Sequence, residues 1–134
     1  MLKLSISFAL FFAFFNSIQA QTAADLTKEA QTLLESGNHD AALAKADAAI
    51  AADGKFAEAY FRRGKIKSAK ANDTEAVADY AKAVELGYAT GELYRLKAMS
   101  EHLLKNDAEG CKDFDKAISL GDAISEDFKA RFCK

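Results

Sequence analysis

The sequence has no proline and no tryptophan, and only two of its 134 residues are cysteines. Half of its residues are hydrophobic, and alanine is prominent among them. These proportions favour a compact helical protein over a disordered or β-rich one. The length allows one domain with a modest core. The composition therefore predicts a single all-α domain.

An excess of positive charge is also missing. Lysine and arginine number 18 against 20 aspartates and glutamates, so the formal net charge is -2. Binding to nucleic acid usually needs a clear positive surplus, so we expect no nucleic-acid partner. The chain has no HExxH, GxSxG or CxxCH motif and no glycine-rich phosphate loop. We therefore expect no catalytic activity, no metal site and no cofactor.

The longest apolar run stands at the start of the chain. Lys3 precedes apolar residues 4–15, and a polar stretch ending in Ala20 follows them. This layout is typical of a secretory signal peptide, so we predict one over residues 1–20 with cleavage after Ala20. About twelve apolar residues span ~18 Å as a helix, less than the ~30 Å of a bilayer core, so an uncleaved anchor is the weaker alternative. We expect an exported protein, periplasmic in a bacterium or extracellular, with no stable membrane insertion after cleavage.

The remainder of the chain repeats every 34 residues. The stretch DFDKAISLGD, from Asp113, nearly repeats DYAKAVELGY, from Asp79, and KADAAIAADG, from Lys45, is a weaker third copy. Residues of one type recur at this spacing, for example Asn38, Asn72 and Asn106, or Ala49, Ala83 and Ala117. The apolar residues of the middle copy follow the i, i+3, i+4, i+7 spacing of a helix face.

Each copy is predicted to contain two helices joined by a short turn. The first helices are predicted over residues 24–36, 57–71 and 91–105. Asparagine and aspartate interrupt the pattern after each of them, where their side chains can cap the next helix. The second helices are expected to end at glycines in the left-handed conformation, namely Gly54, Gly87 and Gly121.

Small and aromatic residues mark fixed places in this unit. In the middle copy they are Tyr60, Gly64, Ala76, Tyr80 and Ala83, and in the third they are Tyr94, Ala98, Gly110, Phe114 and Ala117. The pattern resembles the tetratricopeptide repeat (TPR) family, of an exported bacterial type. The resemblance implies an α-solenoid, with a TPR domain over residues 21–134 and repeats over about 23–56, 57–90 and 91–122. The family's usual proline after the second helix is replaced by Gly54, Tyr88 and Asp122.

The end of the chain is predicted to form a capping helix over residues 123–133. One face of that helix carries Ile124, Phe128 and Phe132. Cys111 and Cys133 each lie 11 residues from Asp122, so an antiparallel hairpin places them side by side. In an exported chain we expect a disulfide between them. A redox or nucleophilic cysteine and a pair of reduced core thiols are the alternatives.

TPR proteins generally hold a segment of another protein in a concave groove lined by their first helices. The resemblance, carried over position by position, gives these groove candidates: Glu58, Phe61, Lys65, Arg95, Met99 and His102. An exposed aromatic ring, a flexible methionine and two cations suit a mixed apolar and acidic peptide. The alternative for each is an ordinary surface residue. The family's clamp for carboxylate-ended chaperone tails is not matched, since its positions hold Thr27, Gln31, Glu92 and Leu96.

A basic run extends from Arg62 to Lys70, with Arg63, Lys65 and Lys67 between them. Its members fall on two sides of a helix, which favours a solvated surface over a strip that binds anions. We therefore expect a monomeric, non-catalytic adaptor for a protein or peptide partner. The alternative is a structural subunit that assembles through its convex or end faces.

Overall fold

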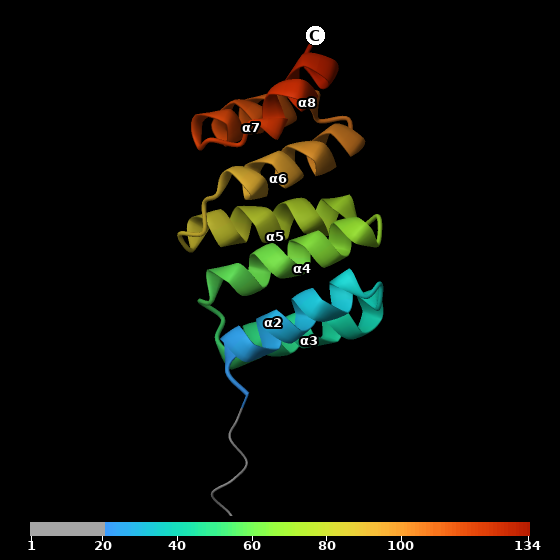
Figure 1. The fold of residues 1–134 in the computed structure, drawn as a ribbon, viewed down its shortest axis with the longest axis vertical. Helices are drawn as coiled ribbons and strands as arrows, with labels where there is room; N and C mark the ends of the chain where they lie inside the picture. The colour runs from blue at the N-terminus through green and yellow to red at the C-terminus, as the bar shows by residue number, and fades with distance from the viewer. Residues whose placement is uncertain (1–20) are drawn as a thin grey trace, which may run out of the picture.

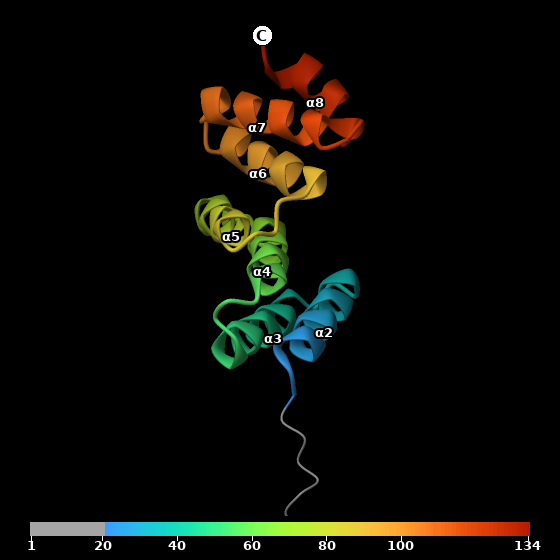
Figure 2. The same cartoon turned by 90° about the vertical axis from the view of Figure 1, so that its left-hand side faces the viewer.

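The computed structural model describes residues 21–134, and within this range it has seven α-helices and no strand. The predicted signal peptide lies outside the described residues. The helices are α2 (Ala23–Glu35), α3 (His39–Ala52), α4 (Ala57–Ala69), α5 (Asp73–Glu85), α6 (Gly91–Leu103), α7 (Asp107–Ser119) and α8 (Ile124–Phe132). They stack in chain order along the long axis, from α2 and α3 at one end to α8 at the other (Figures 1 and 2). The predicted fold class, an all-α solenoid, is confirmed.

The 34-residue period sets where the helices begin. The first helices start at Ala23, Ala57 and Gly91, and the second helices start at His39, Asp73 and Asp107. Helices α2 and α3, α4 and α5, and α6 and α7 pack as hairpins, and each second helix also packs on the next first helix. The first helices contact one another, α2 with α4 and α4 with α6. We call the surface formed by α2, α4 and α6 the inner face.

Asparagine precedes each second helix and caps two of them. The side chains of Asn38 and Asn72 accept hydrogen bonds from the backbone N–H groups of Ala41 and Glu75, as the sequence predicts. Asn106 stands at the same place before α7 but makes no such bond. The turn inside each hairpin passes through one residue with positive φ, and these residues are Gly37 (80°), Ala71 (57°) and Lys105 (65°).

The second helices end in two different ways. Gly87 and Gly121 adopt the predicted left-handed conformation, with φ of 95° and 86°. The prediction for Gly54 is wrong, because the residues with positive φ do not include it. Asp53 stands one repeat before Gly87 and is extended, with φ of -148°. A residue with a β-carbon avoids the left-handed region, so the chain leaves α3 along a different path.

The core lies where the hairpins meet and is built from rings and small residues. Phe61, Tyr80 and Phe114 are fully buried or nearly so. A β-carbon on Gly64 would lie 2.7 Å from Cε1 of Tyr80, so only glycine lets α4 approach the ring on α5 this closely. Small side chains also allow close packing of α3, where Ala42, Ala46 and Ala49 are buried.

Helix α8 packs on α7 and closes the C-terminal end of the solenoid (Figure 1). The rings of Phe128 and Phe132 stack on Phe114, with centroids 6.0 and 6.5 Å away. Ile124 was expected on the same packed face, but it is 56% exposed. Positions eight residues apart on a helix differ by about 80° in direction, so the stripe turns away from α7 at this end.

Candidate functional site

The charged contact candidates on the inner face are paired. Three of the predicted contact residues form ion pairs there. The pairs are Glu58 with Arg62 (2.8 Å), Lys65 with Glu92 (2.9 Å) and Arg95 with Asp122 (2.9 Å). Arg62 also donates to Gln31 of α2 at 3.1 Å, and Lys65 reaches from α4 to α6. These bonds join successive hairpins and hold the side chains in fixed positions.

Phe61 is not the exposed aromatic residue that the sequence predicts. Its ring is fully buried in the core cluster of Tyr80 and Leu93. Tyr88, which follows α5, stacks on it with centroids 4.9 Å apart and an interplanar angle of 28°. Because this ring covers it, Phe61 has no surface to offer a partner, and its assignment as a contact residue is wrong.

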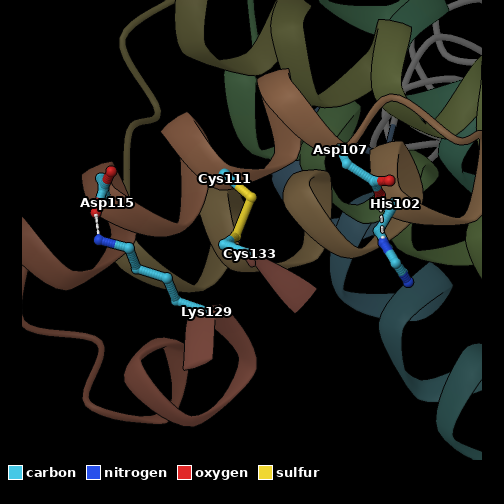
Figure 3. Close-up of a disulfide and its surroundings, with 6 residues drawn as sticks. All are labelled: His102, Asp107, Cys111, Asp115, Lys129 and Cys133. Atoms are coloured by element: carbon cyan, nitrogen blue, oxygen red, sulfur yellow. Dashed lines mark hydrogen bonds and ion pairs between the residues drawn. A yellow bond between two sulfur atoms is a disulfide. The ribbon is translucent and has the colours of Figure 1, made fainter. Parts of the chain in front are cut away.

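The last two candidates lie further along α6 than Arg95. Met99 is half-buried, one turn after Arg95 on α6. His102 lies at the end of α6, where its ring packs on Phe132 of α8 with centroids 4.3 Å apart. Its Nδ1 is 2.5 Å from Oδ1 of Asp107 (Figure 3). His102 therefore belongs to the contact between the third hairpin and its cap.

Two residues of the inner face come from turns and were missed by the sequence analysis. Tyr88 and Asp122 occupy the place of the family's proline, and both reach the first helix of their own hairpin. Tyr88 covers Phe61, and Asp122 accepts a hydrogen bond from Arg95. The signal was present in the sequence, because each turn residue follows its partner by 27 positions. Helix periodicity alone does not detect a contact made by a turn.

A pocket of about 270 Å³ opens on the inner face between α2 and α4. Its walls come from α2 and from the start of α4, and they include Thr27, Lys28, Gln31, Phe56, Glu58 and Arg62. The wall thus combines one ring with two cations and one carboxylate. Such a wall can receive an apolar side chain that has a charged or polar group beside it.

A wider hollow, of about 530 Å³, lies along α2 and α3 at the N-terminal end of the solenoid. Asp25, on this surface, stands at the repeat position that Ala59 and Leu93 occupy. Those two residues are buried against the preceding hairpin. A carboxylate in their place suits a solvated end better than the packing of another helix.

The second helices are tied to the first by two ion clusters. The middle cluster joins Arg63, Lys67 and Asp79, and the third cluster joins Lys97, Glu101 and Asp113 at the same positions one repeat later. Arg63 binds both carboxylate oxygens of Asp79 at 2.8 Å, and Lys67 lies 2.9 Å from one of them. The basic run is therefore paired along its length, since Lys70 binds Asp40 as well, and it forms no strip for anions.

The two clusters differ in charge. The middle cluster has two cations on one carboxylate, whereas Lys97 lies between two carboxylates. Burial raises the pKa of Glu101, although the hydrogen bond from Lys97 opposes this shift. One oxygen of Glu101, Oε2, is buried without a hydrogen-bond partner. Burial lowers the pKa of Lys97, but its bonds to Asp113 and Glu101 outweigh this, so the net shift is upward.

Cys111 and Cys133 are joined by a disulfide between α7 and the residue that follows α8 (Figure 3). The Cα atoms are 5.8 Å apart, so the two cysteines lie side by side, where the hairpin symmetry of the sequence places them. An ion pair between Lys129 and Asp115 fixes α8 to α7 at a second point. The cap is therefore held covalently and electrostatically.

Residues 21–134 include no group of three or more His, Cys, Asp or Glu side chains placed to hold a metal ion. In this same part of the chain, none of the helices has the length and apolar character needed to cross a bilayer.

Compared by sequence, the chain matches no protein-family model and no curated protein. Its fold resembles solved TPR structures. The first TPR of Spaghetti (RPAP3), bound to the HSP90 peptide SRMEEVD, has a TM-score of 0.79 at 17% identity, over 87% of this chain and 94% of that one. The Arabidopsis OM64 TPR domain has a TM-score of 0.78 at 17% identity, over 83% and 93%.

A third structure is YrrB, described as a TPR protein with an unusual peptide-binding site. It has a TM-score of 0.73 at 22% identity, and the match covers 83% of this chain and 57% of that one. These matches show that the chain has the fold of TPR proteins.

Proposed function

We propose that this chain is a non-catalytic TPR module that binds a segment of a partner protein on its inner face. The observation that carries the proposal is the set of bonds between hairpins, from Arg62 to Gln31 and from Lys65 to Glu92. Charged groups that are already fixed lose little freedom when a partner binds. The peptide-bound Spaghetti structure and the description of YrrB support this use of the fold.

The partner is a different one from the HSP90 tail. Clamps for such tails use cations and amides at positions where this chain has Thr27, Gln31, Glu92 and Leu96. Thr27 is also buried, and Glu92 is bound to Lys65. We infer that the partner offers an internal segment rather than a carboxylate end.

We propose that the module acts after export, as a monomer, in a bacterial periplasm or outside the cell. The leader pattern in residues 1–20 supports this location, and so does the disulfide, because disulfides persist in oxidising compartments. Mass spectrometry of the protein from fractionated cells tests it. We expect a chain that begins at Gln21 and whose cysteines resist alkylation. An intact chain with alkylated cysteines in the cytoplasmic fraction would contradict export.

Crosslinking capture from the native cell envelope tests the inner face. One variant, Lys65→Glu, reverses a charge on that face and removes its pair with Glu92. The matched control, Lys82→Glu, removes an exposed Lys–Glu pair on α5. We expect a partner that is captured by the wild type and the control but lost with Lys65→Glu. Equal capture by all three proteins would exclude the inner face as the binding surface.

A second candidate is a structural subunit that assembles through its convex or end faces. Exposed apolar residues at the C-terminal end favour it, namely Leu103 (64%), Leu104 (41%), Leu120 (44%) and Ile124 (56%). Light scattering over a range of concentrations separates the two functions. A mass that rises with concentration, and that falls back in Leu103→Ser/Leu104→Ser, supports assembly. A constant monomer mass supports the inner-face adaptor.

A further inference from the structure

The inner face differs between the first hairpin and the other two. In the middle hairpin Tyr88 lies on Phe61, and in the third hairpin Asp122 binds Arg95. In both, a turn residue covers the same position of the first helix. The chain thus supplies its own side chain at two of three equivalent places.

The first hairpin has no such side chain. Its residue at the turn position is Gly54, and the helix position equivalent to Phe61 is Thr27. Thr27 forms part of the wall of the 270 Å³ pocket between α2 and α4. The pocket is smaller than those that hold drug-sized molecules, so it suits one large side chain. An external side chain can therefore do here what Tyr88 does in the next hairpin.

We propose that this pocket receives an aromatic side chain of the partner segment, with a carboxylate beside it. This inference rests on the proposed function and specifies what the partner must present. The wall has an aromatic ring, Phe56, and the guanidinium of Arg62. That guanidinium lies over the ring of Phe61, 5.3 Å from its centroid, and a planar cation of this kind also stacks on a second ring.

The charges in the wall select the group next to the ring. Arg62 is paired with Glu58 at 2.8 Å, and among residues 21–134 Lys28 has no ion-pair partner. The wall therefore has one cation in excess, at the exposed rim of α2. A carboxylate adjacent to the aromatic residue reaches this lysine, and a lysine or arginine there meets repulsion.

The test is a titration followed by NMR, with ¹⁵N-labelled protein purified from cells that express the full chain. The probe is a blocked tetrapeptide of glycine, tyrosine, aspartate and glycine. We expect amide shifts centred on Thr27, Gln31 and Phe56. Replacing the tyrosine by alanine, or the aspartate by asparagine, is expected to weaken binding about tenfold or more. Shifts spread over all helices, or none at all, would overturn the proposal.

A pair of variants ties binding to the pocket. Ala24 lines the pocket and is exposed, so Ala24→Phe fills the space from its rim without entering the core. Ala78→Phe makes the same change at an exposed site on α5 and is the control. We expect Ala24→Phe to weaken binding of the probe about tenfold or more and Ala78→Phe to leave it unchanged. Circular dichroism verifies that both variants fold, and equal binding by both would overturn the proposal.

The same variants separate this inference from the proposed function. If the captured partner is lost with Lys65→Glu but kept with Ala24→Phe, the inner face binds the partner and the aromatic pocket does not. Loss with Ala24→Phe, together with capture by Ala78→Phe, supports the pocket. Capture by all of these variants excludes both proposals.

Discussion

The middle and third hairpins join their helices at the same three positions but with opposite charge. In the middle cluster one carboxylate, Asp79, is shared by two cations, and both of its oxygens are bound. In the third cluster one cation, Lys97, is shared by two carboxylates, and Glu101 keeps a buried oxygen without a partner. The repeat position thus sets which side chains meet, and the balance of charge sets what the contact costs.

The third hairpin is also held by contacts that the middle one lacks. Helix α8 and the disulfide between Cys111 and Cys133 hold it from outside, whereas the middle hairpin relies on the fit of Gly64 to Tyr80. A hairpin with an incompletely paired ion cluster can persist when a covalent link limits how far it opens.

The largest expected effect comes from removing that link. Cys111→Ser/Cys133→Ser opens a loop of 22 residues and is expected to lower the free energy of unfolding by about 3 kcal/mol. The loss follows from the greater entropy of the unlinked unfolded chain. Urea unfolding measures it, and the wild type treated with reductant serves as the control. Equal midpoints for variant and wild type would show that the disulfide does not stabilise the third hairpin.

The middle cluster gives the next largest effect. Asp79→Ala leaves Arg63 and Lys67 half-buried against each other, and we expect it to lower the free energy of unfolding by about 2 kcal/mol. The loss is no larger because each cation keeps a weaker, exposed partner. Asp113→Ala is the matched change in the third cluster, where Lys97 still has Glu101, and we expect about 1 kcal/mol. Urea unfolding of the two variants gives the comparison. A larger loss for Asp113→Ala would contradict the expectation that the middle cluster contributes more to stability than the third.

The pH dependence of stability distinguishes the clusters further. Because burial raises the pKa of Glu101 in the folded state, this residue contributes stability at low pH that is lost as pH rises through its folded pKa. Glu101→Gln removes this titration. As the pH rises from about 4 to 7, the free energy of unfolding of the variant, measured relative to that of the wild type, is therefore expected to increase by about 1 kcal/mol or less. Unfolding curves at both pH values measure the change, and a relative loss at the higher pH would contradict it.

The smallest effect is expected in the first hairpin. Lys45 pairs there with Glu29, and both side chains are more than a third exposed. Lys45→Ala is expected to change the free energy of unfolding by about 0.5 kcal/mol or less, because solvent screens an exposed pair. Thermal unfolding at low and high salt tests this. A loss comparable to that of Asp79→Ala would show that exposure does not explain the difference between hairpins.

The repeat pattern of the sequence predicted the helices because each of their starts recurs after 34 residues. Counting outward from a turn placed Cys111 beside Cys133. The same counting applies to Arg63 and Asp79, which each lie eight residues from Ala71, so this pair was also accessible. What the pattern does not contain is the path of a turn. Tyr88 covers Phe61 from outside the helices, and this contact removed Phe61 from the candidate site.

The end of α3 was mispredicted for a related reason. Gly54 stands close to the place where a left-handed residue closes the other second helices, but the residue in register with Gly87 is Asp53. A shift of one residue decides whether a glycine closes a helix or follows it. The pocket beside Thr27 lies next to this irregular turn, so the part of the inner face where we propose that a partner binds was the part least visible in the repeat.

The turns inside the hairpins show one more property of the chain. Each requires a left-handed residue, but only the first supplies glycine, and the other two use Ala71 and Lys105. Holding a β-carbon in that conformation costs roughly 1 kcal/mol per residue, so two of the three hairpins close against a local backbone preference. The packing of the helices holds these two turns in the unfavourable conformation. Replacing either residue by glycine would remove this backbone cost but would also raise the conformational entropy of the unfolded chain, so the two effects on the free energy of unfolding largely cancel.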